Sequence, residues 1–294
     1  MRIYLERCKR NRVHFLKLKY NIPSHVSSTG RTSKGEFDID WTGYADDLVL
    51  MFNDIDSLQK GINTLNELFT EYGMKINITK TKTMIFNQQA TVKYPSTIVS
   101  LNGEALENVE IFRYLGSDIR FNEPSTGEAE INLRSDAATG SFYANSRNML
   151  NQKIYMKTRI MMLNSLVRSR LVYGCQAWSC NTNQIKRLNA TYMGYIRRMA
   201  KGGFSRRDGS WSYRYTNSDL LKISDTTDLC SFIEKQQHSY VMKILKKSNE
   251  SIAKRLLLND NKSRKPGPQT TLLTRVLKTS NCTLAELVDM NERK

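Results

Sequence analysis

The chain has 294 residues, of which 39% are hydrophobic, and a formal net charge of +17 at pH 7. Its longest apolar run, residues 48–52, is too short to cross a bilayer, so the sequence predicts no transmembrane segment. The sequence has five scattered cysteines and three histidines, and it contains no Cys-x-x-Cys pair. This pattern argues against both a disulfide framework and a zinc finger. It favours a reducing, intracellular compartment, nuclear or cytoplasmic. The positive charge predicts a polyanionic partner, nucleic acid before a membrane surface.

The charge is unevenly distributed along the chain. Residues 1–40 carry a net charge of +5, residues 41–125 of −4, and residues 126–294 of +16. An acidic middle between basic flanks is typical of a cation-dependent site beside polyanion-binding surfaces. The alternative is that these carboxylates line a solvated face, and charge alone does not decide between the two.

The first predicted elements are a helix and two strands. Residues 1–20 have apolar residues near helical spacing and predict a helix, and residues 21–36 predict a polar loop. Residues 41–52 contain two short aromatic and aliphatic runs separated by Asp46 and Asp47. This pattern predicts two buried strands joined by a two-residue turn.

A clear amphipathic helix is predicted next, over residues 55–72, with Asp54 or Asp56 as its cap and Gly73 after its end. Asn102-Gly103 is a hairpin-turn signal. Further strands are expected over residues 74–77, 80–86, 96–103 and 110–119.

From about residue 126 long helical patterns dominate, with Arg and Lys among apolar residues. Helices are predicted over residues 157–173, 183–199 and 228–247. The predicted fold class is therefore α+β, with a helical and basic region after the mixed part.

Tyr44-Ala45-Asp46-Asp47 is the sharpest chemical signal. Neighbouring residues on a regular strand point to opposite faces, whereas at the tip of a tight hairpin both carboxylates can project from one end. Two adjacent carboxylates repel each other, and a divalent cation would compensate for this. The alternative is an ordinary solvated Asp-Asp turn.

These segments together resemble a known family. GYADDLVLM, followed by an amphipathic helix and GMKINITKTKTMIF, resembles the palm of a reverse transcriptase of the non-LTR, LINE-type retrotransposon class. EIFRYLGS resembles the strand-turn element with which such enzymes grip the primer end. RIMMLNSLVRSRLVYGCQAW and the basic helix after it resemble their thumb.

The resemblance implies particular roles. Asp46 and its partner Asp47 would coordinate catalytic Mg²⁺, with Mn²⁺ as a substitute, and Lys80 would help pyrophosphate to leave. The alternative for Lys80 is a solvated strand lysine. The implied partners are an RNA template, a DNA primer and deoxynucleoside triphosphates. Residues expected to hold the primer end are Phe112, Arg113, Tyr114, Leu115 and Gly116.

The implied architecture is a partial antiparallel palm sheet with packed helices, a helical thumb and a basic helical C-terminal region. The corresponding ranges are residues 1–40 and 41–125 for the palm, 126–203 for the thumb and 204–294 for the last region. The family's third metal-binding carboxylate comes from an earlier strand, and Asp38 and Asp40 are poorly placed to replace it. We therefore expect an N-terminally truncated enzyme that is weak or inactive alone.

The basic helices and the aromatic segment after them predict nucleic-acid contacts, because arginines on helices reach phosphates and aromatic rings stack on bases. Solvated surface arginines, and a loop pinned to the core by Trp211, are the alternatives. The candidate residues are Arg159, Arg168, Arg170, Arg197, Arg198, Arg206, Arg207, Trp211 and Arg214.

Two other functions compete with the polymerase. The first is a non-enzymatic nucleic-acid-binding protein derived from such an element. The second is a different metal-dependent phosphotransferase built on the Asp-Asp turn, which ranks last because the sequence has no identifiable nucleotide-binding loop.

Overall fold

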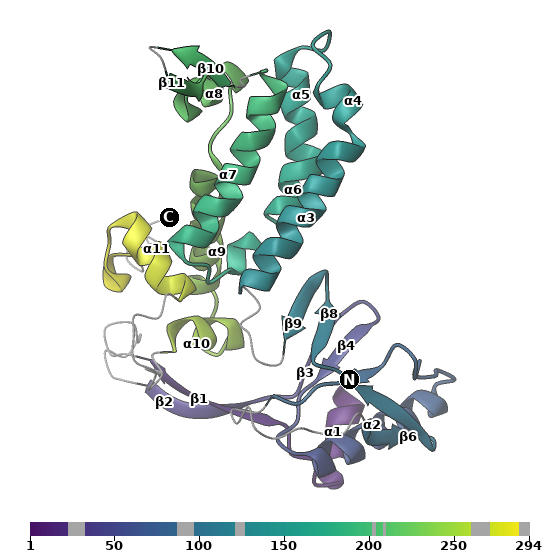
Figure 1. Cartoon of the computed structure of the whole chain (residues 1–294). Helices are drawn as coiled ribbons and strands as arrows, with labels where there is room; N and C mark the ends of the chain where they lie inside the picture. The colour runs from purple at the N-terminus through teal and green to yellow at the C-terminus, as the bar shows by residue number, and fades with distance from the viewer. Residues whose placement is uncertain are drawn as a thin grey trace. The chain divides into compact units, whose positions relative to one another are not determined.

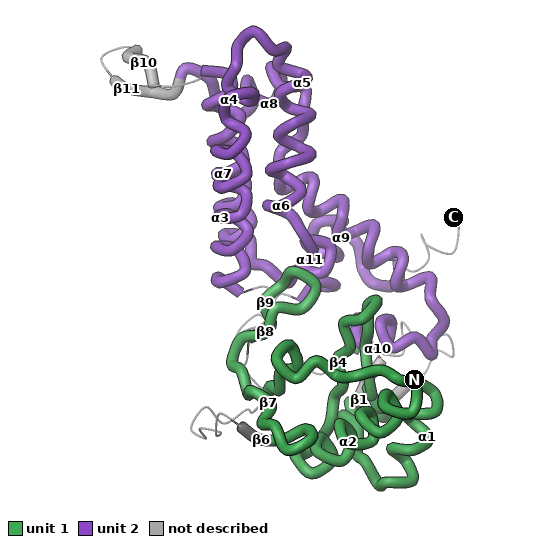
Figure 2. Tube along the Cα trace, turned by 90° about the vertical axis from the view of Figure 1, so that its right-hand side faces the viewer, with its two compact units in different colours: residues 1–124, 258–262 green, residues 125–257, 263–294 purple. Residues whose placement is uncertain are grey.

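The computed structural model shows a mixed α+β protein (Figure 1). The chain forms two compact units, residues 1–124 with 258–262 (unit 1) and residues 125–257 with 263–294 (unit 2) (Figure 2). Within the described ranges, no helix combines the length and the apolar character that crossing a membrane requires. The structure describes residues 1–22, 33–86, 97–120, 127–201, 204–207, 210–259 and 271–287.

Unit 1 combines two helices with short strands. The helices are α1 (Arg2–Arg10) and α2 (Ile55–Glu71). The strands are β1 (Leu16–Ile22), β2 (Ser33–Ile39), β3 (Trp41–Tyr44), β4 (Asp47–Leu50), β5 (Lys82–Thr83), β6 (Thr97–Leu101), β7 (Glu104–Asn108), β8 (Ile111–Tyr114) and β9 (Ser117–Arg120). They form the antiparallel hairpins β1–β2, β3–β4 and β8–β9 and a three-stranded sheet in the order β5-β7-β6. The described strands thus form several small sheets rather than one continuous sheet.

Two predictions at the start of unit 1 hold only in part. The helix expected over residues 1–20 ends at Arg10, and β1 begins at Leu16. Leucine alternates with lysine in that segment, the period of two that suits a strand paired with β2. The expected loop lies partly outside the described residues, which resume in β2. Residues 74–77, expected as a strand, have no regular structure.

Helix α2 confirms the amphipathic pattern. The carboxylate of Asp54 accepts a hydrogen bond from the Ser57 amide at 2.7 Å and caps its start. The chain leaves the helix through Gly73, whose φ of +70° suits glycine. The apolar face of α2 packs on α1, and the Tyr4 hydroxyl donates to the Gly61 carbonyl at 3.2 Å. This core contains Tyr4, Cys8, Val13, Leu65 and Leu68.

Unit 2 is mainly helical. Its segments are α3 (Glu128–Ala144), α4 (Ser146–Met149), α5 (Met156–Met162), a π-helix (Leu163–Arg168), α6 (Ser169–Leu171), a 3₁₀ turn (Cys175–Ala177), α7 (Thr182–Met199), β10 (Phe204–Arg207), β11 (Ser210–Tyr213), α8 (Asn217–Ser224), α9 (Leu229–Leu245), α10 (Ile252–Leu258, whose last residue is grouped with unit 1) and α11 (Leu272–Ser280). The three long helices predicted in this region are confirmed within one or two residues at most boundaries.

The π-helix is a local irregularity that polar side chains support. The Ser141 hydroxyl of α3 donates to the Leu166 carbonyl at 2.8 Å, and the Tyr192 hydroxyl of α7 donates to Asn164 Oδ1 at 2.8 Å. Because a π turn misaligns the usual helical hydrogen bonds, such side-chain partners stabilise it. The helices around it share one buried core that includes Phe142, Leu163, Leu171, Leu188, Tyr192 and Ile196.

Candidate active site and nucleic-acid interface

The β3–β4 hairpin carries the two candidate catalytic aspartates. Its register pairs Tyr44 with Asp47, so the two-residue turn is Ala45-Asp46. The expected turn, Asp46-Asp47, is therefore displaced by one residue, because Asp47 already belongs to β4. Ala45 has a φ of +53°, a left-handed conformation that is strained for a residue with a Cβ.

The base of this hairpin is anchored while its tip is open. Leu48 and Leu50 pack against the α1–α2 core, and the Leu16 amide donates to the Met51 carbonyl at 3.1 Å. At the tip, Tyr44 is 68% exposed, and Asp46 and Asp47 are exposed as well. The fold thus presents two carboxylates to solvent at the tip of a hairpin whose base packs on the core.

The donor set at this tip suits a hard cation in type but is small in number. Carboxylate oxygens are the ligands Mg²⁺ prefers, and Mg²⁺ in polymerase-like sites keeps waters and substrate phosphates as further ligands. Among the residues that the structure describes, no group of three or more His, Cys, Asp or Glu side chains could hold a metal ion. The carboxylates of Asp46 and Asp47 therefore suit a cation whose other ligands come from substrate phosphates and water.

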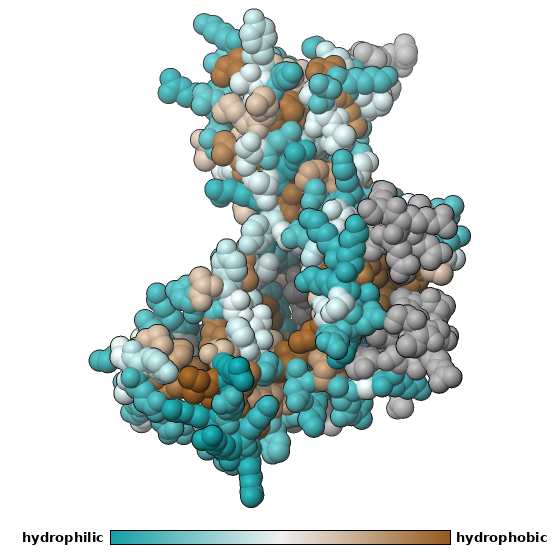
Figure 3. Space-filling model, turned by 180° about the vertical axis from the view of Figure 1, so that it is seen from behind, coloured by the Kyte–Doolittle hydropathy of each residue, from teal (hydrophilic) through white to brown (hydrophobic). Residues whose placement is uncertain are grey.

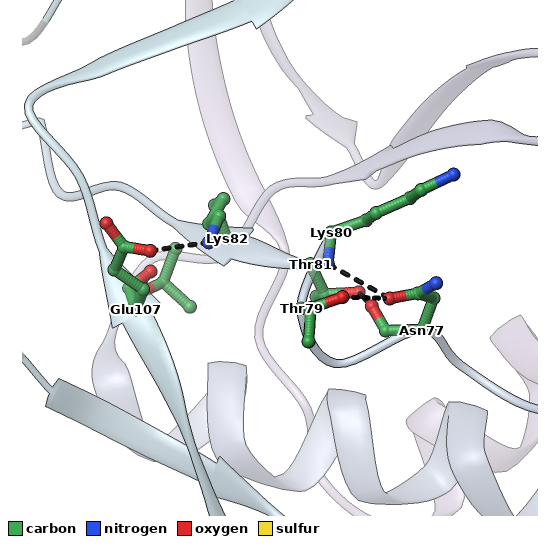
Figure 4. Close-up of polar contacts among 7 residues, drawn as sticks. Asn77, Thr79, Lys80, Thr81, Lys82 and Glu107 are labelled. Carbon is green, nitrogen blue, oxygen red and sulfur yellow. Dashed lines mark hydrogen bonds and ion pairs between the residues drawn. The ribbon is translucent and has the colours of Figure 1, made fainter.

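Lys80 lies in a turn that Asn77 organises (Figure 4). Asn77 Oδ1 accepts hydrogen bonds from the Lys80 amide at 3.1 Å and from the Thr79 hydroxyl at 2.8 Å. The Lys80 side chain extends away from this turn, whereas the neighbouring Lys82 donates to Glu107 at 2.5 Å. Lys80 is therefore on a turn rather than the expected strand, with an exposed ammonium on a fixed backbone.

The candidate primer-holding residues form the first strand and the turn of the β8–β9 hairpin. Leu115 and Gly116 occupy the turn with φ of +49° and +80°. Both positive values are the pattern of a type I′ turn, which disfavours leucine at its first position. Arg113 Nε donates to Asp118 Oδ1 at 2.9 Å across the hairpin, and Phe112 and Tyr114 are half-buried.

Arg159 departs from its expected role. Its side chain is only 5% exposed, and its guanidinium donates to the carbonyls of Ile154 at 3.0 Å, Met199 at 2.7 Å and Met149 at 3.4 Å. Burial lowers the pKa of Arg159 below its ordinary value. This geometry gives Arg159 a structural role, and it does not support a phosphate contact.

The other arginines of the helices reach the surface in different ways. Arg170 is exposed, and the Arg168 guanidinium lies over the Phe232 ring at 4.4 Å from its centroid. Arg197 donates to Asn217 Oδ1 at 2.8 Å, and Arg198 donates to the Tyr143 hydroxyl. These contacts orient guanidinium groups without cancelling their charge.

The aromatic segment after α7 is described in part. β10 and β11 pair antiparallel, with Arg206 opposite Trp211 and Arg207 opposite Ser210 in the register. The side chains of Arg206, Arg207 and Trp211 lie outside the described part of the chain. Arg214 is exposed.

Two features of the site were not predicted from the sequence. The cross-helix pair of Tyr143 and Arg198 joins residues far apart in the chain, and no local pattern indicates it. The turn that holds Lys80 does have a local signal, since an Asn side chain commonly closes a turn by accepting a hydrogen bond from the backbone a few residues further on.

Comparison with known proteins finds two similarities. Residues 21–119 match the family described as reverse transcriptase (RNA-dependent DNA polymerase). This range contains the β3–β4 hairpin, the Lys80 turn and nearly all of the β8–β9 hairpin. The chain is also 27% identical over 197 residues, 66% of this chain and 67% of the relative, to a transposon-derived protein of Caenorhabditis elegans. No solved structure matches.

Proposed function

We propose that this chain is a retrotransposon reverse transcriptase fragment of the LINE type, with RNA-directed DNA polymerase chemistry in the intact parent. The observation that carries the proposal is the match of residues 21–119 to reverse transcriptases, which includes the exposed Asp46 and Asp47. The transposon-derived relative supports the origin. In this proposal residues 1–125 correspond to palm and residues 126–203 to thumb, followed by a basic region, and the protein acts in the nucleus or cytoplasm.

Each candidate residue has a role that its surroundings allow. Asp46 and Asp47 would hold Mg²⁺, which would polarise the reacting phosphate and favour attack by the primer 3′ oxygen. Lys80, on its Asn77-closed turn, would offset charge developing on the leaving pyrophosphate. The β8–β9 turn at Leu115-Gly116 would contact the primer end.

We expect polymerase activity of this chain alone to be weak or absent. Mg²⁺ demands near-ideal octahedral coordination, and two exposed carboxylates supply only part of it. Positioning of both the attacking and the leaving oxygen depends on a complete metal site.

The test is primer extension on an RNA template with Mg²⁺ or Mn²⁺, together with Mn²⁺ binding followed by electron paramagnetic resonance in the presence of primer–template and nucleotide. The Asp46→Asn/Asp47→Asn variant should lose any extension and the nucleotide-dependent Mn²⁺ signal. Glu67→Gln removes one exposed carboxylate on α2, away from the hairpin, and is the control for loss of a surface charge. Extension that persists in the double variant would overturn the catalytic assignment.

A second candidate function is a non-enzymatic nucleic-acid-binding protein. The net charge of +16 on residues 126–294 favours it, because that charge lies outside the part matching reverse transcriptases. Under this alternative, binding is sensitive to salt and indifferent to Mg²⁺ and to both aspartates.

A further inference from the structure

A long stretch of unit 2 has no acidic residues. Between Asp136 and Asp208 the sequence contains thirteen Lys or Arg and not one Asp or Glu. Nearby carboxylates usually balance basic residues on a protein surface. Within this stretch there are none, although Arg187 pairs with Glu128, which precedes it in α3. Where these helices meet, the positive electrostatic potentials of their cations add.

Several of these helices meet at one end of unit 2. The cartoon and the Cα trace both show the same elements gathered there (Figures 1 and 2): the end of α3, all of α4, the start of α5, the end of α7 and the start of α8. The space-filling view from behind shows long hydrophilic side chains standing out from the same end (Figure 3). We call this surface the basic end and define it by Arg147, Lys153, Lys157, Arg198 and Lys201, all exposed.

Buried hydrogen bonds hold the basic end together. Arg159 donates to carbonyls on both sides, those of Met149 and Ile154 before α5 and that of Met199 at the end of α7. The side chain of Gln152 donates to the same Met199 carbonyl at 3.1 Å. The loop between α4 and α5, with Lys153, is therefore fixed against the last turn of α7, so the surface is formed before any partner binds.

Two tyrosines stand among these cations. Tyr155 is 86% exposed and caps α5 through its backbone alone, with no side-chain hydrogen bond to the helix. Tyr143 is 52% exposed, and the Arg198 guanidinium lies 5.5 Å from its ring centroid. The packing of unit 2 does not account for a tyrosine as open as Tyr155.

A carboxylate that α8 brings to this end is already engaged. Asp219 accepts hydrogen bonds from the Thr216 amide at 2.9 Å and from the Thr216 hydroxyl at 2.7 Å, which closes the cap of α8. These bonds leave the negative charge of Asp219 in place, but the five cations that define the basic end outnumber it.

We propose that the basic end binds single-stranded nucleic acid, with Tyr155 stacking on a base and the surrounding Lys and Arg side chains neutralising adjacent phosphates. Open aromatic rings beside cations suit a single strand, because its unpaired bases expose their faces, whereas a duplex offers mainly its backbone. The proposal adds a binding site to the proposed function and requires neither Asp46 nor Asp47.

The experiment measures binding of the full chain to a fluorescein-labelled, mixed-sequence single-stranded RNA and to the duplex of the same sequence, by fluorescence anisotropy. Tyr155→Ala should weaken single-strand binding by about tenfold and duplex binding by less than about twofold. Tyr155→Phe keeps the ring and should bind like the wild type. The exposure of Tyr155 makes a folding defect in either variant unexpected, and circular dichroism checks this.

The charges are tested separately by Lys153→Gln/Lys157→Gln. The plot of log affinity against log salt has a negative slope, and for the single strand this variant should make it shallower by about 1.4. Lys243→Gln/Lys246→Gln, an equal charge change where α9 leads to α10, is the matched control and should change the slope less. Equal losses of single-strand and duplex affinity in Tyr155→Ala, or equal effects of the two lysine pairs, would overturn the proposal.

Failure of the polymerase proposal has a different signature. If primer extension and the Mn²⁺ signal do not depend on Asp46 and Asp47, the catalytic assignment fails. Single-strand binding that still depends on Tyr155 would leave the basic end intact as a binding surface.

Discussion

At the scale of single residues, the arginines of unit 2 illustrate why residue type alone does not define an interface. Arg159 and Arg170 lie on one continuous helical segment, and a sequence pattern treats them alike. Arg159 faces the core and donates to three carbonyls, while Arg170 is exposed. Whether a guanidinium is buried or exposed depends on the tertiary packing, because its burial is tolerated only where hydrogen-bond acceptors surround it.

Replacing Arg159 should therefore affect stability. In Arg159→Leu the carbonyls that it satisfies become buried without a donor, and the free energy of unfolding of unit 2 should fall by about 2–4 kcal/mol. Urea unfolding followed by circular dichroism measures this. Arg147→Leu, on the exposed surface, is the control and should change stability by less than about 0.5 kcal/mol. Similar effects of both substitutions would contradict the structural role of Arg159.

At the scale of elements, the hairpin turns of unit 1 differ in how well their residues suit their backbone. Asn102-Gly103 has φ of +53° and +82°, and both residue types adopt such values readily. The β8–β9 turn has the same signs of φ at Leu115-Gly116, and the β3–β4 turn has Ala45 at +53°. The two ill-suited turns are those that carry candidate catalytic and primer-holding residues, as expected where function outweighs local preference.

Reciprocal substitutions test this difference. Leu115→Asn should stabilise unit 1 by about 0.5–1.5 kcal/mol, because asparagine tolerates the left-handed conformation better than leucine does. Asn102→Leu should destabilise the unit by a similar amount. Thermal unfolding of the two variants beside the wild type provides the measurement. If Leu115→Asn lowers the melting temperature, strain at this turn is not the dominant effect.

The cap of α2 makes a pH-dependent prediction. The hydrogen bond from the Ser57 amide holds the pKa of Asp54 below its ordinary value. A carboxyl whose pKa is depressed by folding stabilises the folded state above its unfolded pKa of about 3.9, and this contribution is lost as the pH falls through the folded value. Asp54→Ala should therefore cost about 1 kcal/mol at pH 7.

The loss of stability in Asp54→Ala should shrink as the pH is lowered below about 4, because the Asp54 carboxyl of the wild type then becomes protonated and no longer stabilises the helix as an anion. Asp54→Asn keeps a capping oxygen and should lose less than Asp54→Ala at pH 7. Urea titrations at several pH values give both comparisons. An Asp54→Ala cost that stays constant down to pH 2 would exclude the ionised cap as its origin.

At the scale of the whole molecule, the sequence predicts elements better than it predicts how they meet. Helix α2 follows from its apolar spacing, its cap Asp54 and Gly73, all within one stretch of chain. The β3–β4 turn is displaced by one residue because strand register depends on pairing across the hairpin.

Long-range contacts are the least accessible to sequence patterns. The exposed aspartates and the Lys80 turn lie within segments whose local motifs point to them. The burial of Arg159, in contrast, depends on Met199, forty residues further along the chain. Such a contact forms only when helices pack, and neither periodicity nor capping signals reports it.

The charge distribution leads to a prediction for the entire chain. With a net charge of +17, the protein should bind nucleic acid mainly by releasing counterions from phosphates, so its affinity should fall steeply with salt. If five cations contact a single strand, log affinity against log salt should have a slope of about −3.5. Anisotropy titrations between low and physiological salt measure this slope. Asp46 and Asp47 belong to the acidic segment, residues 41–125, and not to the basic region that would contact phosphates. Asp46→Asn/Asp47→Asn should therefore leave the slope unchanged. Added Mg²⁺ should act only as a competing salt. A shallow slope, or binding that requires Mg²⁺ and both aspartates, would place the main nucleic-acid contact at the metal site instead of the basic helices.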